Sequence, residues 1–269
     1  MPHTDIKLIA LDIDGTIMDK NFRISGKVKE AISQAVKKGV HVLIATGRMY
    51  SATVPIGVEL GLKTPLIVYQ GGLIKEFYRS DRTLLHYPLD VKTTYSVIND
   101  ARTKDIQINV YFDDELYVEQ ESPMLQEYVS ARNISYRRVA RFEDMGNFLP
   151  TKILLMDRDV QKTDFVLNEF RGKYADKLYV TKSTDYFCEL VNKKCSKADA
   201  IKFLADKWQI ERSEIMAIGD HENDREMLDF AALGVAMGNS SESLKLAADY
   251  VTDTVDNDGA ALAIEKFAV

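Results

Sequence analysis

The sequence predicts an α/β protein in which a doubly wound parallel sheet carries a second, α+β domain inserted into it. Short apolar runs alternate with amphipathic helical segments near both ends of the chain, which is the pattern of parallel βαβ units. Between them, strands of alternating hydrophobicity mix with helices, which is typical of an antiparallel sheet. With 269 residues, the chain is long enough for two unequal domains. We therefore expect residues 1–84 and 189–269 to form the core and residues 85–188 to form the insertion.

The first parallel unit begins near the N-terminus. Residues 8–11 form an apolar run that predicts a buried strand ending in an acidic turn. A helix is expected from Ser25, a suitable N-cap, to Lys38, where Gly39 closes it. A second apolar strand over residues 40–45 follows at once. Strand, helix and strand in this order predict a right-handed parallel unit.

The parallel pattern continues through a third strand and then changes. A helix over residues 50–60 leads to a strand over residues 65–69, and residues 74–90 predict a hairpin with its turn near Asp81. Within the insertion we expect helices over 91–101, 123–129 and 164–171 and strands over 106–111, 116–118, 152–156, 177–181 and 186–191. The mixture predicts an antiparallel sheet with its helices on one face.

The pattern of alternating helices and apolar strands, which predicts parallel strands, resumes toward the C-terminus. Ser196 is a suitable N-cap for a helix that carries Lys197 in its first turn. A strand over residues 215–220 ends in Asp220, and the acidic start of another helix follows over residues 221–228. We expect the chain to close with short elements over residues 233–237, 242–248, 250–252 and 259–267.

Composition narrows the class of protein. The net charge of −6, without a dense lysine and arginine cluster, argues against a nucleic-acid partner. No run approaches the roughly 18 apolar residues of a membrane span, and the N-terminus does not resemble a signal peptide, so we expect a cytoplasmic protein without a membrane partner. Cys188 and Cys195 are too few for a disulfide framework. A nucleophilic Cys195 is disfavoured because no histidine evidently pairs with it.

Two acids follow the first strand. Asp12 and Asp14 are one residue apart, so in extended backbone their side chains point the same way and Ile13 points the other way. A hard cation such as Mg²⁺ between the two carboxylates would offset their repulsion. Gly15 permits a sharp turn with exposed N–H groups that suit an anion, and Thr16 adds a hydroxyl. Taken alone, the pattern is equally an ordinary strand-end turn.

Polar residues also follow the other predicted parallel strands. Because such strands end at one edge of a sheet, we expect a cluster there that comprises Asp12, Asp14, Thr46, Lys197, Asp220, Asn223 and Asp224. Asp12 and Asp220 can hold Mg²⁺, while Lys197 and Thr46 would face phosphate oxygens. Each of these residues, taken alone, is also explained as a helix cap or, for Lys197, as a solvated lysine. Because they follow several separate strands, their combination favours a site for phosphoryl chemistry.

Such a site permits a specific reaction. An aspartate can attack phosphorus directly and form an aspartyl-phosphate, which water later cleaves. Asp14 would then protonate the leaving alkoxide and afterwards take a proton from the attacking water. Because the first of these roles needs a carboxylic acid, we expect the neighbours of Asp14 to raise its pKa.

These residues resemble the motifs of the haloacid dehalogenase superfamily of phosphatases, specifically the Cof-type group with a large α/β cap. The four motifs correspond to Asp12–Thr16, Thr46–Arg48, Lys197 after Ser196, and Gly219–Asp224. The last motif is the most specific, and the resemblance covers nearly the whole chain.

The resemblance implies a Rossmann-like, haloacid dehalogenase-like core and an inserted cap that closes over the site and selects the substrate. It implies that Asp12 is the nucleophile and a Mg²⁺ ligand, and that Asp14 is the acid/base and binds the metal through its backbone carbonyl. Asp220 would complete the metal shell. Phosphate would be held by the Ile13 backbone, Thr46, Gly47, Lys197 and Asn223, with Asp224 and Arg48 in supporting roles.

Three stretches depart from the family pattern. Gln70–Gly72 stand where Asn-Gly-Ala is frequent, Asn192–Cys195 replace Pro-x-Gly-Val, and Ala198 replaces a glycine. The last two lie at a predicted hinge of the cap, so we expect them to affect the choice of leaving group more than the chemistry. Lys193 or Lys194 could meet a second anionic group of the substrate, although a pair of solvated lysines is the simpler interpretation.

We therefore predict a phosphatase that uses Mg²⁺ and an aspartyl-phosphate to hydrolyse small phosphate monoesters, such as sugar phosphates or cofactor phosphates. A sugar phosphomutase shares that intermediate and stays open as an alternative. A phospho-aspartate switch also combines acids, a threonine and a lysine, but the insertion argues against such a compact domain. The candidates for contact with the substrate, in the insertion or at its boundary, are Tyr111, Tyr117, Tyr186 and Glu189.

Overall fold

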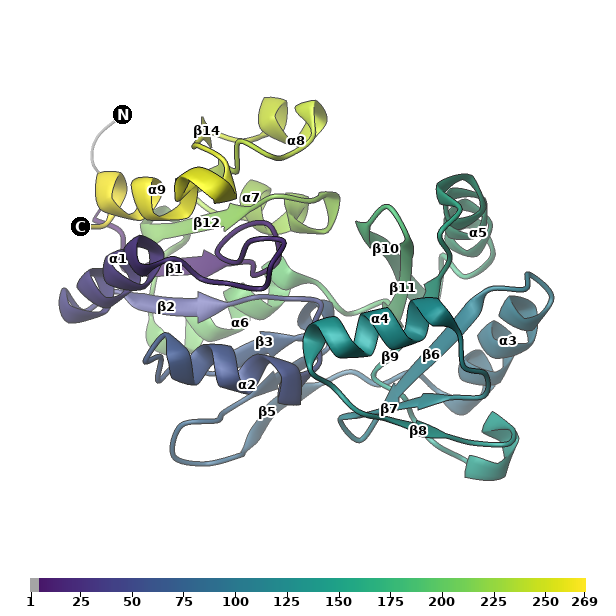
Figure 1. Cartoon of the computed structure of the whole chain (residues 1–269). Coiled ribbons are helices and arrows are strands. Elements are labelled where there is room, and N and C mark those ends of the chain that lie inside the picture. Colours follow the sequence, from purple (N-terminus) through teal and green to yellow (C-terminus); the bar gives the residue numbers. More distant parts are fainter. Residues whose placement is uncertain (1–4) are drawn as a thin grey trace.

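The computed structural model describes residues 5–269 and has a parallel sheet at the centre of one half (Figure 1). Five strands follow one another in the order β14-β13-β12-β1-β2, and every neighbouring pair is parallel. In that order the strands are Tyr250–Val251, Leu233–Ala236, Ile215–Gly219, Leu8–Leu11 and His41–Ile44. The order confirms the predicted α/β class and puts β1 between β12 and β2.

Side chains of β1 alternate between two hydrophobic cores. Ile9 and Leu11 share a core with α1 (Gly26–Lys37) and α9 (Gly259–Phe267), which lie together on one side of the sheet in Figure 1. Leu8 and Ala10 share the other core with α6. The remaining helices of this half are α6 (Lys197–Trp208), α7 (Arg225–Phe230) and α8 (Glu242–Ala247). Burial on both faces explains why β1 carries no polar residue until it ends.

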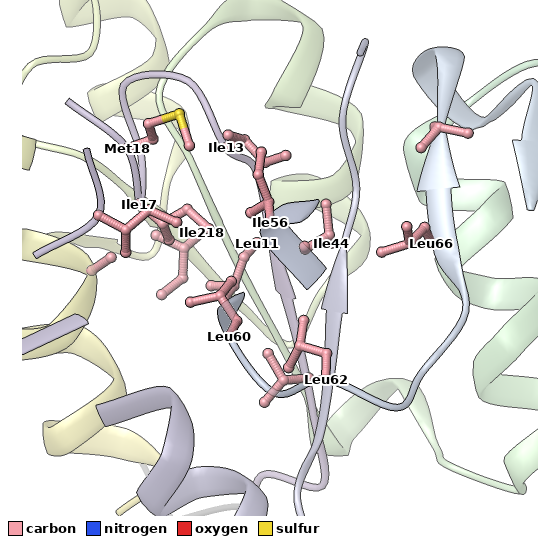
Figure 2. Packing of buried hydrophobic residues seen from close by; sticks show 14 of the residues in the cluster. Leu11, Ile13, Ile17, Met18, Ile44, Ile56, Leu60, Leu62, Leu66 and Ile218 are labelled. Atoms are coloured by element: carbon pink, nitrogen blue, oxygen red, sulfur yellow. The ribbon is translucent and has the colours of Figure 1, made fainter. Parts of the chain in front are cut away.

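Helix α2 (Tyr50–Glu59) packs near the ends of β1 and β2. Figure 2 shows Ile13 and Leu11 close to Ile56 of α2 within this buried cluster. The side chain of Ile13 has no exposed surface. Its burial anchors the turn that presents the two acids on either side of it.

The predicted third strand lies outside the main sheet. β3 (Leu66–Val68) pairs instead with β4 (Leu73–Lys75), which pairs with β5 (Thr83–His86) in a small antiparallel sheet. The β4–β5 pair confirms the predicted hairpin. A parallel bridge between Ala45 and Ile67 links β3 to the irregular segment that follows β2. Since β2 has already ended there, β3 does not extend the parallel ladder.

A second sheet fills the other half of the molecule (Figure 1). Its strand order is β10-β11-β9-β6-β7-β8, and all neighbours are antiparallel except β7 with β8. In that order the strands are Leu178–Thr184, Phe187–Asn192, Lys152–Met156, Gln107–Phe112, Glu115–Val118 and Tyr136–Arg138.

Helices cover both faces of this second sheet, so the expectation of helices on one face was wrong. Helices α3 (Val91–Arg102) and α5 (Val160–Lys173) share a core with Ile153 and Leu155 of β9. Helix α4 (Pro123–Arg132) shares a core with the alternate residues of β9, Leu154 and Met156. Residues 153–156 of β9 are apolar on both faces of the sheet, and each face therefore needs a covering layer.

Several element bounds differ from the prediction. Helix α5 begins four residues early, because the Asp159 carboxylate accepts the N–H groups of Gln161 at 2.9 Å and Lys162 at 3.2 Å. Strand β8 and the 3₁₀ turn Phe142–Met145 were not predicted. The helix predicted over residues 221–228 begins as a 3₁₀ turn, Glu222–Asp224, and continues as α7 (Arg225–Phe230). The division at residues 84/85 and 188/189 stays a prediction, and its second boundary falls within β11.

Within residues 5–269, no helix combines the length and the apolar character needed to cross a membrane.

Candidate active site

Three neighbouring strands end at one level of the main sheet. The parallel register of β1 with β2 and β12 runs to Leu11. Asp12, Thr46 and Asp220 stand just beyond these strands, and all three are buried. The structure therefore brings together the polar groups that the strand ends predicted.

Lys197 links two of the carboxylates. Its Nζ lies 2.6 Å from Asp12 Oδ1 and 2.6 Å from Asp224 Oδ1. The side chain of Lys197 is 1% exposed, which excludes the solvated lysine that its position on a helix also allowed. Burial lowers the pKa of Lys197, but Asp12 and Asp224 outweigh it and leave this pKa raised. Burial and Asp224 together hold the pKa of Asp12 above its usual range.

Asp220 is held by three neighbours. The Thr16 hydroxyl donates to Asp220 Oδ1 at 3.1 Å, His221 Nδ1 lies 2.6 Å from Asp220 Oδ2, and Asn239 Nδ2 donates to the same oxygen at 3.4 Å. The hydrogen bond with Asp220 raises the pKa of His221 to about 9. Neither His221 nor Asn239 was predicted as a site residue. Asn239 lies just beyond β13. It would have been predicted if polar residues after this strand had been considered together with those after β1, β2 and β12.

Asp14 is paired with Arg48. Nε of Arg48 donates to Asp14 Oδ2 at 2.8 Å, and Nη2 donates to Asp14 Oδ1 at 2.5 Å. Burial raises the pKa of Asp14, but the bidentate guanidinium outweighs it and leaves this pKa lowered. The expectation of a raised pKa was therefore wrong for this arrangement, because it overlooked a cation that comes from the next strand end.

The segment after β2 is fixed from several sides. Thr46 Oγ1 accepts the Arg48 N–H at 3.2 Å, and the Thr46 carbonyl accepts the Gln70 N–H at 3.0 Å. Asn223 Nδ2 in turn donates to Gln70 Oε1 at 3.2 Å. A Cβ added at Gly47 would stand 2.3 Å from Gln70 Nε2, so glycine at this position lets the Gln70 side chain lie against the turn. Gln70 thus connects Thr46 with Asn223 through hydrogen bonds. From the sequence, Gln70 was noted only as a departure from the family pattern, and this structural role was not predicted.

The acids supply a donor set that fits a divalent cation. Asp12, Asp220 and Asp224 are buried, and each offers a carboxylate oxygen within 4.8 Å of the others. Clustered carboxylate oxygens are the ligands that Mg²⁺ prefers, and buried negative charges need such compensation. The predicted set contained Asp14 in place of Asp224. The Asp14 carboxylate is paired with Arg48 and is not part of this cluster. The predicted metal contact of Asp14 is made by its backbone carbonyl, and it stays a prediction.

A pocket of about 50 Å³ lies between the two sheets, and the residues that line it from the main-sheet side are Asp12, Asp14, Thr46, Gly47, Arg48, His221 and Asn223. The second sheet and α4 contribute part of its lining, namely Tyr128, Arg132, Lys152, Leu154, Ser183, Thr184, Phe187 and Glu189. Of the four residues predicted as candidates for contact with the substrate, Glu189 lines this pocket, whereas Tyr111, Tyr117 and Tyr186 do not. Lys193 and Lys194 are exposed away from it, which agrees with solvated side chains.

The two thiols should be inert in the native protein. Cys188 and Cys195 are both buried, and burial raises the pKa of each to about 12. At pH 8 only about one thiol in 10⁴ would be ionised, and the thiolate is the reactive form. We therefore expect negligible reaction with Ellman's reagent until guanidinium unfolds the chain, after which both thiols should react. Rapid modification of either thiol in the native protein would contradict this expectation, and modification at Cys195 would support that residue as a nucleophile.

Known proteins resemble this chain over almost its full length. A 5-amino-6-(5-phospho-D-ribitylamino)uracil phosphatase of Bacillus subtilis is 32% identical, with 98% of this chain and 97% of the relative covered. Phosphatase YwpJ of the same organism is 28% identical over 95% of this chain and 98% of its own. The crystal structure of a haloacid dehalogenase-like hydrolase from Bacteroides thetaiotaomicron is 32% identical, with a TM-score of 0.86, and the match covers 97% of this chain and 99% of that one.

The fold, the acids at the strand ends and the similar proteins all indicate the same class of protein. Residues 9–264 match the haloacid dehalogenase-like hydrolases, and the chain belongs to this family. Within the family it is a phosphatase, as its curated relatives are. The resemblance drawn from the four motifs is thereby confirmed.

Proposed function

We propose that this phosphatase hydrolyses small phosphate monoesters through an aspartyl-phosphate on Asp12, with Mg²⁺ as cofactor. The observation that carries the proposal is the buried ammonium of Lys197, 2.6 Å from both Asp12 and Asp224 at the end of the central strand. A buried carboxylate beside a fixed cation is protected from water and oriented toward the pocket that Asp12 lines.

In the first half of the reaction, an oxygen of Asp12 forms a bond to phosphorus while the bond from phosphorus to the leaving oxygen breaks. Asp14 supplies the proton that the leaving alkoxide takes up. In the second half, Asp14 accepts a proton from water, whose oxygen bonds to phosphorus and releases Asp12 and inorganic phosphate. The Arg48 contact favours the ionised Asp14 of the second half. The first half requires this contact to loosen when substrate enters.

The remaining predicted residues bind the phosphoryl group. We assign its oxygens to the Lys197 ammonium, the Thr46 hydroxyl, the side chain of Asn223 and the backbone N–H groups of Ile13 and Gly47. Mg²⁺ would be held by Asp12, Asp220 and the Asp14 carbonyl, with Asp224 in support, and would offset the repulsion between the carboxylate nucleophile and the phosphate dianion.

The part of the pocket formed by the second sheet and α4 supports a polar leaving group. Ser183, Thr184 and Glu189 offer hydrogen-bonding groups, while Tyr128 and Phe187 offer aromatic surface. Such a lining suits the hydroxyl groups and ring of a sugar phosphate or cofactor phosphate. We propose that the insertion acts as the cap that selects this group and that the enzyme works in the cytoplasm.

Release of p-nitrophenol and phosphate from p-nitrophenyl phosphate tests the proposal. We expect release in the presence of Mg²⁺, loss of release in EDTA, and recovery when excess Mg²⁺ is added back. A compact chromogenic ester avoids dependence on the unknown leaving group. Release that is indifferent to EDTA would contradict the metal requirement.

Two further outcomes separate the alternatives. Isomerisation of a sugar phosphate without net release of phosphate would favour a phosphomutase. A stable phosphoprotein that forms without release would favour a phospho-aspartate switch. Either result, obtained with folded protein, would contradict hydrolysis as the main reaction.

A further inference from the structure

Helix α2 receives its N-terminal cap from the other half of the molecule. The residue before the helix, Met49, makes no side-chain hydrogen bond to the helix. Instead, Asp114 Oδ1 accepts the N–H of Tyr50 at 2.9 Å, and Asp114 Oδ2 accepts the N–H of Ser51 at 2.9 Å. These N–H groups have no partner within a helix, so an external carboxylate both satisfies them and complements the helix dipole.

Asp114 is held in place by its turn and by a tyrosine. It is the second residue of the two-residue turn between β6 and β7, where Asp113 and Asp114 have φ values of 51° and 56°. Glycine would fit the second position of this turn better than aspartate, so the side chain is kept against the local backbone preference. The Tyr69 hydroxyl also donates to Asp114 Oδ1 at 2.8 Å.

A second contact joins the same two parts of the molecule a few residues earlier. Lys152 of β9 donates from Nζ to the Gly47 carbonyl at 2.6 Å. Glu189 orients this ammonium at 3.0 Å, and both side chains are almost fully buried. The second sheet therefore holds residues 47–51 at both ends, and this segment contains Arg48 and adjoins Thr46.

We propose that Asp114 is a positioning residue for the phosphatase reaction. By capping α2, it ties the placement of the insertion to the conformation of residues 46–51, so that the phosphate-binding groups reach their working geometry when the insertion is seated on the core. The proposal rests on the phosphate-binding role assigned above to Thr46 and Gly47. Asp114 itself lies outside the residues that line the pocket.

The variant Asp114→Gly tests this cleanly. It removes the carboxylate and leaves an Asp-Gly turn, which is a favoured sequence for this hairpin, so folding is not at risk. Hydrogen exchange at the Tyr50 and Ser51 amides should accelerate by about 2- to 30-fold, the range that corresponds to loss of an N-cap. The value of kcat for p-nitrophenyl phosphate should fall by at least about 3-fold, with a smaller change in KM, because the misplaced groups act on the transition state.

Two further variants complete the design. Asp113→Asn alters the exposed neighbour in the same turn and should leave both readouts unchanged. Asp114→Asn tolerates the same backbone conformation and keeps one acceptor oxygen, so it should recover part of the exchange protection and part of kcat. A purely structural role would instead raise exchange throughout β1 and β12 and leave kcat per folded molecule unaltered.

The results test the role of Asp114 independently of the proposed phosphatase reaction. Unchanged exchange at Tyr50 and Ser51 in Asp114→Gly would overturn the capping assignment. Faster exchange with unchanged kcat would overturn the positioning role, as would an equal loss in Asp113→Asn. If the unmodified protein releases no phosphate under any condition, the proposed function fails, whereas the exchange measurement still tests the contact with α2.

Discussion

Replacement of Asp12 by asparagine will lower phosphate release from p-nitrophenyl phosphate by at least about 10³-fold, since loss of a covalent nucleophile removes a whole reaction path. The amide keeps the size of the side chain but not the anionic oxygen that bonds to phosphorus. The fold should persist, because Lys197 keeps Asp224 as a carboxylate partner at 2.6 Å when Asp12 is replaced. Circular dichroism and urea unfolding would verify that persistence.

Asp229→Asn supplies the matched control for this experiment. Asp229 lies exposed on α7, outside the pocket lining, and its replacement should leave the rate unchanged. A rate for Asp12→Asn within tenfold of the unmodified enzyme would show that another group attacks phosphorus. In that event the role of Asp12 would reduce to metal binding, and the predicted aspartyl-phosphate would be discarded.

Lys197→Met is expected to damage both activity and stability. The ammonium bridges Asp12 and Asp224, and its removal leaves two buried carboxylates without their partner. Breaking a buried ion pair from one side costs about 3–5 kcal/mol of unfolding free energy. Phosphate release should fall by about 10²- to 10³-fold, because we assign the same ammonium to the binding of the phosphoryl oxygens.

The control for Lys197 lies on the same helix. Lys202 forms an exposed i,i+4 pair with Asp206 at 2.6 Å, and its side chain is 55% exposed. Lys202→Met should change the unfolding free energy by less than about 0.5 kcal/mol. Urea unfolding in EDTA, which keeps metal binding from masking the difference, measures both variants. Equal stability of the two would mean that the buried carboxylates are compensated by other groups.

Local patterns predicted most of the core and the centre of the site. The apolar runs of β1, β2 and β12 are visible in the sequence because these strands are buried on both faces. Asp12, Thr46 and Asp220 follow directly after those runs. These residues come together because the carboxyl ends of neighbouring parallel strands lie at one edge of the sheet, and this holds whatever the details of packing.

Pairings between distant residues were beyond the reach of such patterns. The lowered pKa of Asp14 depends on the guanidinium of Arg48, whose direction the sequence does not encode locally. Likewise, β3 looks like another parallel strand by its apolar run, yet its partners are chosen by the backbone that surrounds it. Which face of the second sheet each of α3, α4 and α5 covers likewise depends on packing between distant residues.

The sequence by itself determined the strand ends, their acids and the lysine at the start of α6, because periodicity, capping and chain connectivity are properties of neighbouring residues. The tertiary structure decided which charges compensate one another, that Glu189 rather than Tyr111, Tyr117 or Tyr186 lines the pocket, and that Asp114 caps a helix 64 residues earlier in the chain. Those outcomes depend on how the two sheets meet, and contacts across such an interface follow from the packing of whole elements rather than from any short stretch of sequence.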